Sequence, residues 1–85
     1  MRSIELIDKA EATGTSLAEW ARRLGLSRNA LTAARHHGSL SPALAATLAH
    51  ELGEPVLPYL KAAVLENEKA EPMRRKLTAA LGRIA

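Results

Sequence analysis

The sequence contains no cysteine and no phenylalanine, and it has one tryptophan and one tyrosine among its 85 residues. Without cysteine, the chain can form no disulfide, no thiolate metal site and no cysteine nucleophile. No apolar run approaches the ~20 residues that a helix needs to span a bilayer, and the charged N-terminal segment is unlike a signal peptide. We therefore expect a cytoplasmic protein that does not associate with membranes.

Recognisable catalytic patterns are missing as well. The chain has no glycine-rich phosphate loop and no H-E-x-x-H pattern, and its carboxylates are spread without an obvious pair on an apolar face. His36 and His37 are adjacent, so their side chains diverge on a helix, and no carboxylate or cysteine stands at ligand spacing from them. We expect no enzymatic activity, no metal, no cofactor and no small-molecule ligand.

The residues that are abundant favour helices. Alanine and leucine dominate the apolar set, whereas β-branched and aromatic residues are scarce. Ala, Leu, Arg, Lys and Glu are the strongest helix formers, so the composition predicts an all-α fold. A chain of this length is expected to form one domain with a small core. We predict five to six short helices, with a core formed by residues 1–54 and a C-terminal helical extension in residues 55–85.

Apolar spacing and capping residues place the predicted helices. Serine precedes the first four of them, where its hydroxyl can accept a free first-turn amide. One of these serines also stands three residues before a glutamate, the spacing of a capping box, and another precedes a proline that suits the first helical position. The predicted helices cover residues 4–13, 17–24, 28–37, 42–52, 55–70 and 72–83, and the predicted N-caps are Ser3, Ser16 (with Glu19), Ser27 and Ser41 (with Pro42).

Residues 16–38 read SLAEWARRLGLSRNALTAARHHG, which predicts two helices joined by a three-residue turn that contains glycine. This is the pattern of a helix-turn-helix unit. Ala21 suits a close approach of the two helices, and Gly25 can adopt the positive φ of a sharp turn. Leu26 and Leu31 are expected to fill the wedge between the helices.

This stretch resembles the helix-turn-helix of lambda-repressor/Cro-like (Xre-type) regulators. Leu24-Gly25-Leu26-Ser27 matches their L-G-[VL]-S turn, residues 41–53 match their fourth helix, and residues 54–65 are similar to short Cro-like proteins of phages. The resemblance covers roughly residues 1–65. The sequence departs from the family pattern where many relatives have Gln, Glu and Gly, namely at Leu17, Arg35 and His37.

The resemblance implies that the helix of residues 28–37 enters the major groove of DNA. Arginine pairs bidentately with guanine and asparagine with adenine, and small methyl groups can contact the thymine methyl. Hydroxyls and cationic side chains around the turn would contact phosphates. The predicted base contacts are Arg28, Asn29, Thr32, Ala33 and His36, and the predicted phosphate contacts are Ser16, Arg22, Arg23, Ser27, Arg35 and His37.

Two basic blocks agree with a polyanionic partner, because residues 15–40 carry a net charge of +3 and residues 72–85 one of +4. The run Arg74-Arg75-Lys76 is either a second DNA contact or a solvated helix face. Family members bind as two-fold dimers on inverted half-sites, so we expect a homodimer. The last two helices either supply the dimer seam, through Val64, Leu65, Met73, Leu77 and Leu81, or fold back to complete the monomer.

These features predict a sequence-specific double-stranded DNA-binding transcriptional regulator, of the phage or mobile-element repressor type. Two other functions fit the same fold. One is a protein-interaction module, such as an antitoxin or adaptor, and the other is an excisionase-like architectural DNA-binding protein with weak sequence preference. The arginine and asparagine expected where bases are read favour DNA over a protein partner.

Overall fold

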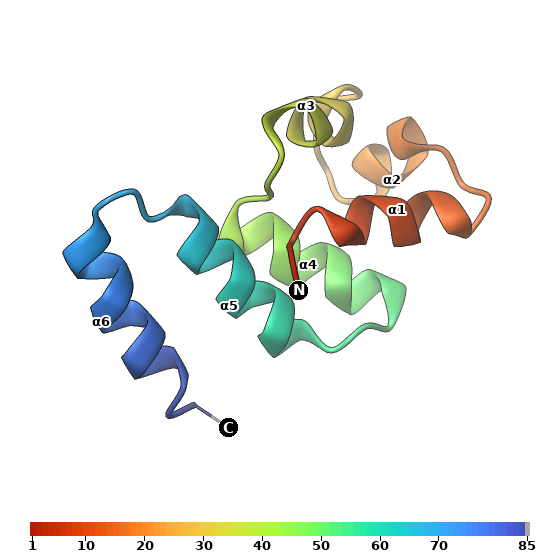
Figure 1. The fold of residues 1–85 in the computed structure, drawn as a ribbon. Helices are drawn as coiled ribbons and strands as arrows, with labels where there is room; N and C mark the ends of the chain where they lie inside the picture. Colours follow the sequence, from red (N-terminus) through yellow and green to blue (C-terminus); the bar gives the residue numbers. More distant parts are fainter. Residues whose placement is uncertain (85) are drawn as a thin grey trace.

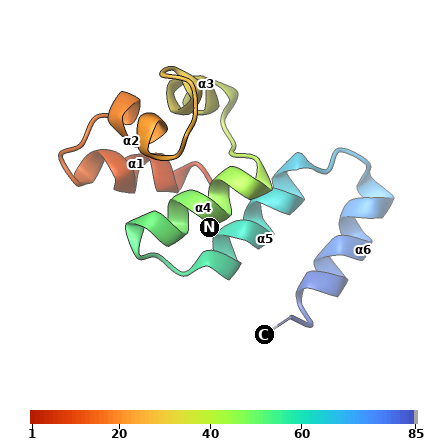
Figure 2. The ribbon, with the colours of Figure 1, turned by 180° about the vertical axis from the view of Figure 1, so that it is seen from behind.

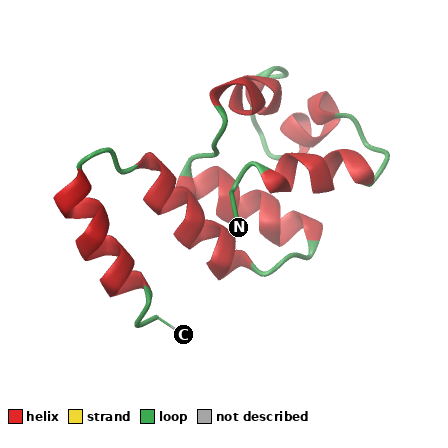
Figure 3. Ribbon diagram, in the orientation of Figure 1, coloured by secondary structure: helices red, strands yellow, loops and turns green. Residues whose placement is uncertain are grey.

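The computed structural model describes residues 1–84, which form six α-helices and no strand (Figure 1, Figure 3). This confirms the predicted all-α fold. None of the helices in this range is long and apolar enough to cross a membrane. The helices are α1 (Glu5–Ala12), α2 (Leu17–Arg23), α3 (Ala30–His37), α4 (Pro42–Leu52), α5 (Val56–Asn67) and α6 (Glu71–Leu81).

A small core lies between α1, α2, α3, α4 and α5, with α4 near its centre (Figure 1). α5 packs along α4, while α1 contacts both α4 and α2, and α2 packs against α3. Most core side chains are alanine or leucine, which lets short helices approach each other closely. The buried apolar residues are Leu6, Ile7, Ala10, Leu17, Trp20, Ala21, Leu31, Leu40, Ala45, Leu48, Ala49, Tyr59 and Ala63.

The connection between α2 and α3 is longer than the sequence predicts. α3 begins at Ala30, so Leu24–Asn29 forms a six-residue connection instead of three residues. Arg28 and Asn29 form a turn, in which the Ala30 amide donates to the Ser27 carbonyl over 3.1 Å. Asn29, with φ −98° and ψ 6°, precedes the helix in place of Ser27, and neither side chain caps it. The prediction of Ser27 as N-cap was therefore wrong.

Ser3 also has a role other than the predicted N-cap. Ile4 is the residue that precedes α1, and no side chain caps this helix. Ser3 is instead fully buried, and its hydroxyl donates to the Glu66 carboxylate and accepts from the Leu40 amide, which lies 2.9 Å away. The Ser3 amide donates to the second oxygen of the same carboxylate over 2.9 Å. Ser3 thus joins the N-terminal segment to α5 and to the segment before α4.

The wedge between α2 and α3 is filled only in part as predicted. Ala21 and Leu31 are fully buried, as expected, but Leu26 is 39% exposed. The Leu26 amide donates to the Ala21 carbonyl over 2.8 Å, which closes the end of α2 and directs the Leu26 side chain outward. The prediction that Leu26 fills the wedge was wrong.

α6 lies apart from the core. It is beside α5 and away from α1 to α4 in both views (Figure 1, Figure 2). α5 contributes Tyr59 and Ala63 to the core, whereas no residue of α6 is buried. α5 ends at Asn67 instead of the predicted residue 70, because the backbone turns to extended conformation at Glu68 and Ala70. α6 therefore lies back beside α5 without contributing a buried residue to the core.

Candidate nucleic-acid interface

One face of α3 is exposed along its whole length. Asn29, Thr32, Ala33 and His36 follow the i, i+3, i+4, i+7 spacing, so they share this face, and all four are exposed. Leu31 lies on the opposite side and is fully buried against α2 and the core. The burial of one side thus fixes which side chains α3 presents to a partner, and these are four of the predicted base-contact residues.

Arg28, the fifth predicted base contact, stands in the turn before α3 and is exposed. The turn is set by a Schellman motif at the end of α2, in which Gly25 has φ 74°. The Gly25 amide donates to the Arg22 carbonyl, and the Leu26 amide donates to the Ala21 carbonyl. A side chain at residue 25 would strain this conformation, so glycine is what lets the chain reverse and bring Arg28 beside α2.

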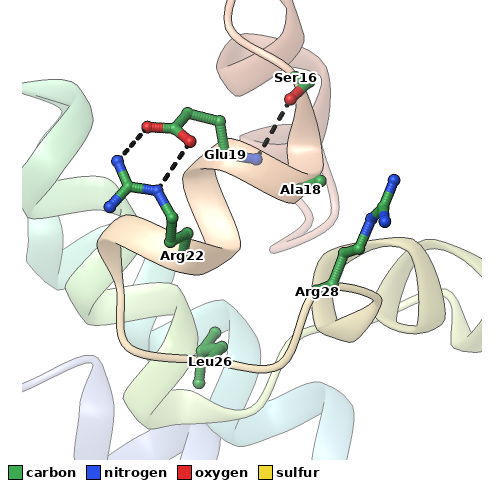
Figure 4. Close-up of a pocket in the computed structure, with 6 residues that line it drawn as sticks. All are labelled: Ser16, Ala18, Glu19, Arg22, Leu26 and Arg28. Carbon is green, nitrogen blue, oxygen red and sulfur yellow. Dashed lines mark hydrogen bonds and ion pairs between the residues drawn. The ribbon is translucent and has the colours of Figure 1, made fainter.

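An open pocket of about 380 Å³ lies between α2 and this turn (Figure 4). Arg22 and Arg28 stand on opposite sides of it, and the Arg28 guanidinium projects away from the other labelled residues. Within residues 1–84, the Arg28 side chain forms no hydrogen bond or ion pair. The residues that line the pocket are Ser16, Ala18, Glu19, Arg22, Leu26 and Arg28.

The arginines of α2 differ from Arg28, because both are paired with Glu19. The Arg22 guanidinium donates to both carboxylate oxygens of Glu19, with 2.9 Å between Nε and Oε2. The Arg23 Nε lies 3.5 Å from Oε1 of the same carboxylate. The hydrogen bonds from Arg22, with the positive charge of both arginines, lower the pKa of Glu19 to about 2. Glu19 therefore offsets part of the positive charge beside the pocket.

Only one of the two hydrogen bonds of the predicted capping box at the start of α2 forms. The Ser16 hydroxyl accepts from the Glu19 amide over 3.1 Å, as an N-cap should. The Glu19 carboxylate does not return to the Ser16 amide, because it is engaged by Arg22. The sequence does contain a signal for this competing ion pair. Arg22 and Arg23 follow Glu19 by three and four residues, the spacing at which helical side chains interact.

Arg23 lies over the ring of Trp20, with 5.1 Å between its guanidinium carbon and the ring centroid. This distance is within the range of a cation–π interaction. The Trp20 indole is itself fixed, since Nε1 donates to the Ala10 carbonyl over 3.1 Å. Arg23 is thus held along α2 while remaining exposed.

Arg35 is directed toward α1. Its guanidinium donates to both oxygens of Glu11, with 3.2 Å between Nη1 and Oε2, and lies 3.8 Å from Asp8. The hydrogen bonds from Arg35 lower the pKa of Glu11 and raise that of Arg35. Arg35 therefore joins α3 to α1, in addition to being one of the exposed cationic side chains of α3.

The remaining predicted phosphate contacts, Ser27 and His37, are exposed at the two ends of α3. α3 ends at Gly38, which has φ 93°, so His37 keeps helical backbone. The structure thus brings Ser16, Arg22 and Arg28 to one pocket, whereas the other predicted contacts lie outside its lining, on α2, in the α2–α3 connection and on α3.

The sequence reasoning missed an apolar feature beside this pocket. A second open pocket, of about 260 Å³, lies between the α2–α3 connection and α4, and Leu26 borders both pockets. Its other lining residues are Leu24, Ala30, Ser41, Ala43, Leu44 and Thr47. No motif in the sequence marks it, because its walls come from segments up to 23 residues apart.

Comparison with known protein families, curated proteins and solved structures finds no match to this chain. Within residues 1–84, no group of three or more His, Asp or Glu side chains is arranged to hold a metal ion. The surface formed by α2, the turn and α3 is the candidate functional site.

Proposed function

We propose that the protein is a sequence-specific double-stranded DNA-binding transcriptional regulator, of the phage or mobile-element repressor type. In this proposal α3 enters the major groove with its exposed face toward the base edges. A groove about 12 Å wide admits one α-helix, and the second helix of a helix-turn-helix unit is the one that reads bases.

The observation that carries the proposal is the state of Arg28. It stands beside an exposed helix face that has a predominantly polar, hydrogen-bonding character, and within residues 1–84 it has no intramolecular partner. An arginine placed in this way is free to donate two hydrogen bonds to guanine O6 and N7. Asn29 follows it directly and supports the same reading, because its amide matches adenine N6 and N7.

Backbone contacts would orient the complex. Arg22 and Arg23 lie on α2 beside the pocket, and their guanidinium groups can exchange the Glu19 carboxylate for DNA phosphates. Ser16, Ser27 and His37 are exposed around the same surface. These contacts carry no sequence information, so they set affinity and register while α3 sets specificity.

We further propose that the protein binds as a homodimer, with each copy reading one half of an inverted repeat. Two-fold symmetric regulators place their recognition helices one DNA turn apart, about 34 Å. The net charge of +3 in residues 15–40 supports an encounter with DNA through this part of the chain.

Selection of binding sequences from a pool of random duplexes tests the proposal, followed by sizing of the complex. We expect enrichment of an inverted repeat that is occupied by two protein copies. An unenriched pool that is nevertheless bound would indicate the architectural function. Absence of duplex binding at ~50 mM salt, where electrostatic contacts are strong, together with recovery of a stoichiometric protein partner, would indicate the protein-interaction module.

A further inference from the structure

α6 carries an apolar stripe that the described chain covers only in part. Met73, Leu77 and Leu81 recur at helical spacing and therefore lie on one side of α6, and Ile84 follows three residues after the helix ends. Met73 is 53% exposed and Ile84 49% exposed, while Leu77 and Leu81 are half-buried. An apolar stripe at this spacing is the usual sign of a face that packs against another element.

Two hydrogen bonds join α5 to α6 and to the residues that follow it. The Arg74 Nε donates to the Leu65 carbonyl over 3.2 Å, and the Lys61 Nζ donates to the Ile84 carbonyl over 2.6 Å. α5 has half-buried apolar residues that are not among those packed against the core, namely Leu57, Leu60 and Val64. The two helices together form an apolar surface that is only partly closed.

The whole chain exposes more surface than its mass requires. A compact monomer of 9.1 kDa is expected to expose about 4,900 Å² and to have a radius of gyration of about 12 Å. The chain exposes 5378 Å² and has a radius of gyration of 13.2 Å. The excess, about 500 Å², is a large part of the roughly 800 Å² that each partner contributes to a standard interface.

We infer that a second copy of this chain binds to the α5–α6 surface. The two copies contact each other through the same apolar stripe of α6. In a two-fold interface, the same patch of each copy contacts its counterpart on the other. An apolar stripe can meet this requirement, because it can pack against an identical stripe. This inference deepens the homodimer of the proposed function by assigning its interface. It rests on the proposed function only in assigning this dimer to the binding of an inverted repeat in DNA.

The cations of α6 lie off the stripe, so they leave it available for an apolar contact. Arg75 lies on the side of the helix opposite the stripe, and Arg74 and Lys76 flank it, so the cations would remain in solvent at the rim of an apolar contact. A polyanion would bind the cationic side and leave the stripe exposed. A membrane surface fits less well, because the apolar face of α6 has leucine but none of the tryptophan or phenylalanine that interfacial helices also carry there; the one tryptophan and the one tyrosine of the chain are core residues.

Sedimentation equilibrium of the full chain without DNA tests the inference. We expect the wild type to form dimers in the micromolar range, and Leu77→Asp and Met73→Asp each to raise the dimer dissociation constant at least tenfold. Ala79→Asp is the matched control, because it adds the same charge to the face of α6 opposite the stripe and should leave association unchanged. Because α6 has no buried residue, the variants should keep the helical circular dichroism of the wild type.

The salt dependence of binding distinguishes a second copy of the chain from DNA or a membrane as the partner of α6. An apolar dimer with cations at its rim should not weaken between 50 and 500 mM salt, whereas binding to DNA or to anionic vesicles weakens steeply. A wild type that stays monomeric at 100 μM, or a dimer that Ala79→Asp weakens as much as Leu77→Asp does, would overturn the inference. Monomeric protein that binds vesicles of anionic lipid would assign the stripe to a membrane surface instead. None of these outcomes depends on whether the protein binds DNA.

Discussion

The predicted DNA contacts of the α2–α3 region fall into two groups, side chains that are already paired within the chain and side chains that are not. Arg22 shares the Glu19 carboxylate with Arg23, and Arg35 is paired with Glu11. Arg28 lies beside the same pocket as Arg22, and within residues 1–84 it is unpaired. An unpaired arginine can form a new bidentate contact without giving up an old one, so Arg28 is the better candidate for reading a base.

Substitution of Arg28 and Arg22 should therefore have different consequences. Arg28→Ala should remove about 1–3 kcal/mol of discrimination at one base pair, because a bidentate arginine–guanine contact has this value. Arg22→Ala should weaken binding to all duplexes alike, as expected for a phosphate contact. Titration of each variant with the selected operator and with single-base changes measures both effects. A uniform loss in both variants would remove Arg28 from the base contacts.

Glu19 is expected to restrain DNA binding. Its carboxylate holds Arg22 and Arg23 and adds a negative charge beside the pocket. Glu19→Gln should raise affinity for any duplex about two- to fivefold at low salt, because Arg22 and Arg23 would then contact phosphates without first giving up a carboxylate, and exposed ion pairs of this kind are weak. Glu51→Gln is the control, because it changes the net charge equally on an exposed position of α4. Equal gains in the two variants would show a general charge effect.

The same ion pair predicts a pH dependence. The pKa of Glu19 is lowered from its ordinary value of 4.5 to about 2 in the folded chain, first by the hydrogen bonds from Arg22. A lowered folded pKa means that the stabilisation is fully present above pH 4.5 and is lost as the pH falls toward 2. Titration of the Glu19 carboxyl carbon by NMR should show a midpoint near 2 in the wild type. In Arg22→Ala the midpoint should move back toward 4.5.

At the scale of elements, the predictions succeeded where a helix end is defined by its neighbours in sequence. Ser16 and Ser41 accept from amides three residues ahead, and Gly38 ends α3 with a positive φ. Ser3 and Ser27 have the same local sequence character and do not cap. The partner of Ser3, Glu66, lies 63 residues away, so no local pattern distinguishes this serine from a cap.

The candidate site shows the same division. Helical spacing was enough to place Asn29, Thr32, Ala33 and His36 on one face, because the period of a helix is fixed. The ion pair of Arg35 with Glu11 spans 24 residues, and it depends on how α1 packs relative to α3. Leu26 is exposed for a similar reason, since the path of the α2–α3 connection is set by hydrogen bonds that the residue pattern does not specify.

The buried serine provides a test of how the elements are joined. Ser3→Ala removes the acceptor of the Leu40 amide and one donor to Glu66. We expect a loss of about 1–3 kcal/mol in the free energy of unfolding, the cost of leaving a buried polar group without its partner. Urea unfolding followed by circular dichroism measures it. Ser41→Ala is the comparison, because the Ser41 cap is exposed and its loss should cost about 1 kcal/mol. A smaller loss in Ser3→Ala than in Ser41→Ala would contradict the role given to Ser3.

At the scale of the whole molecule, the chain consists of a packed part, α1 to α5, and a projecting helix. The buried apolar residues all lie between Leu6 and Ala63. α6 follows an extended segment at residues 68–70 and lies beside α5 only. The α2–α3 surface and α6 are therefore on separate parts of the molecule (Figure 2), so α3 could contact DNA, as proposed, while α6 contacts a second copy.

This arrangement predicts where a protease cuts first. Lys69 is exposed and lies in the extended segment between α5 and α6, and proteases prefer such segments to packed helices. Brief digestion with trypsin at low protein concentration should therefore cut first after Lys69. The fragment of residues 1–69 should unfold cooperatively at nearly the same temperature as the full chain, because it keeps the whole core. If α6 binds a second copy, the rate of this cut should fall as the protein concentration rises. First cuts at arginines of α2 or α3 would show that these helices open more readily than residues 68–70. A fragment without cooperative unfolding would show that α6 stabilises the core of each protomer.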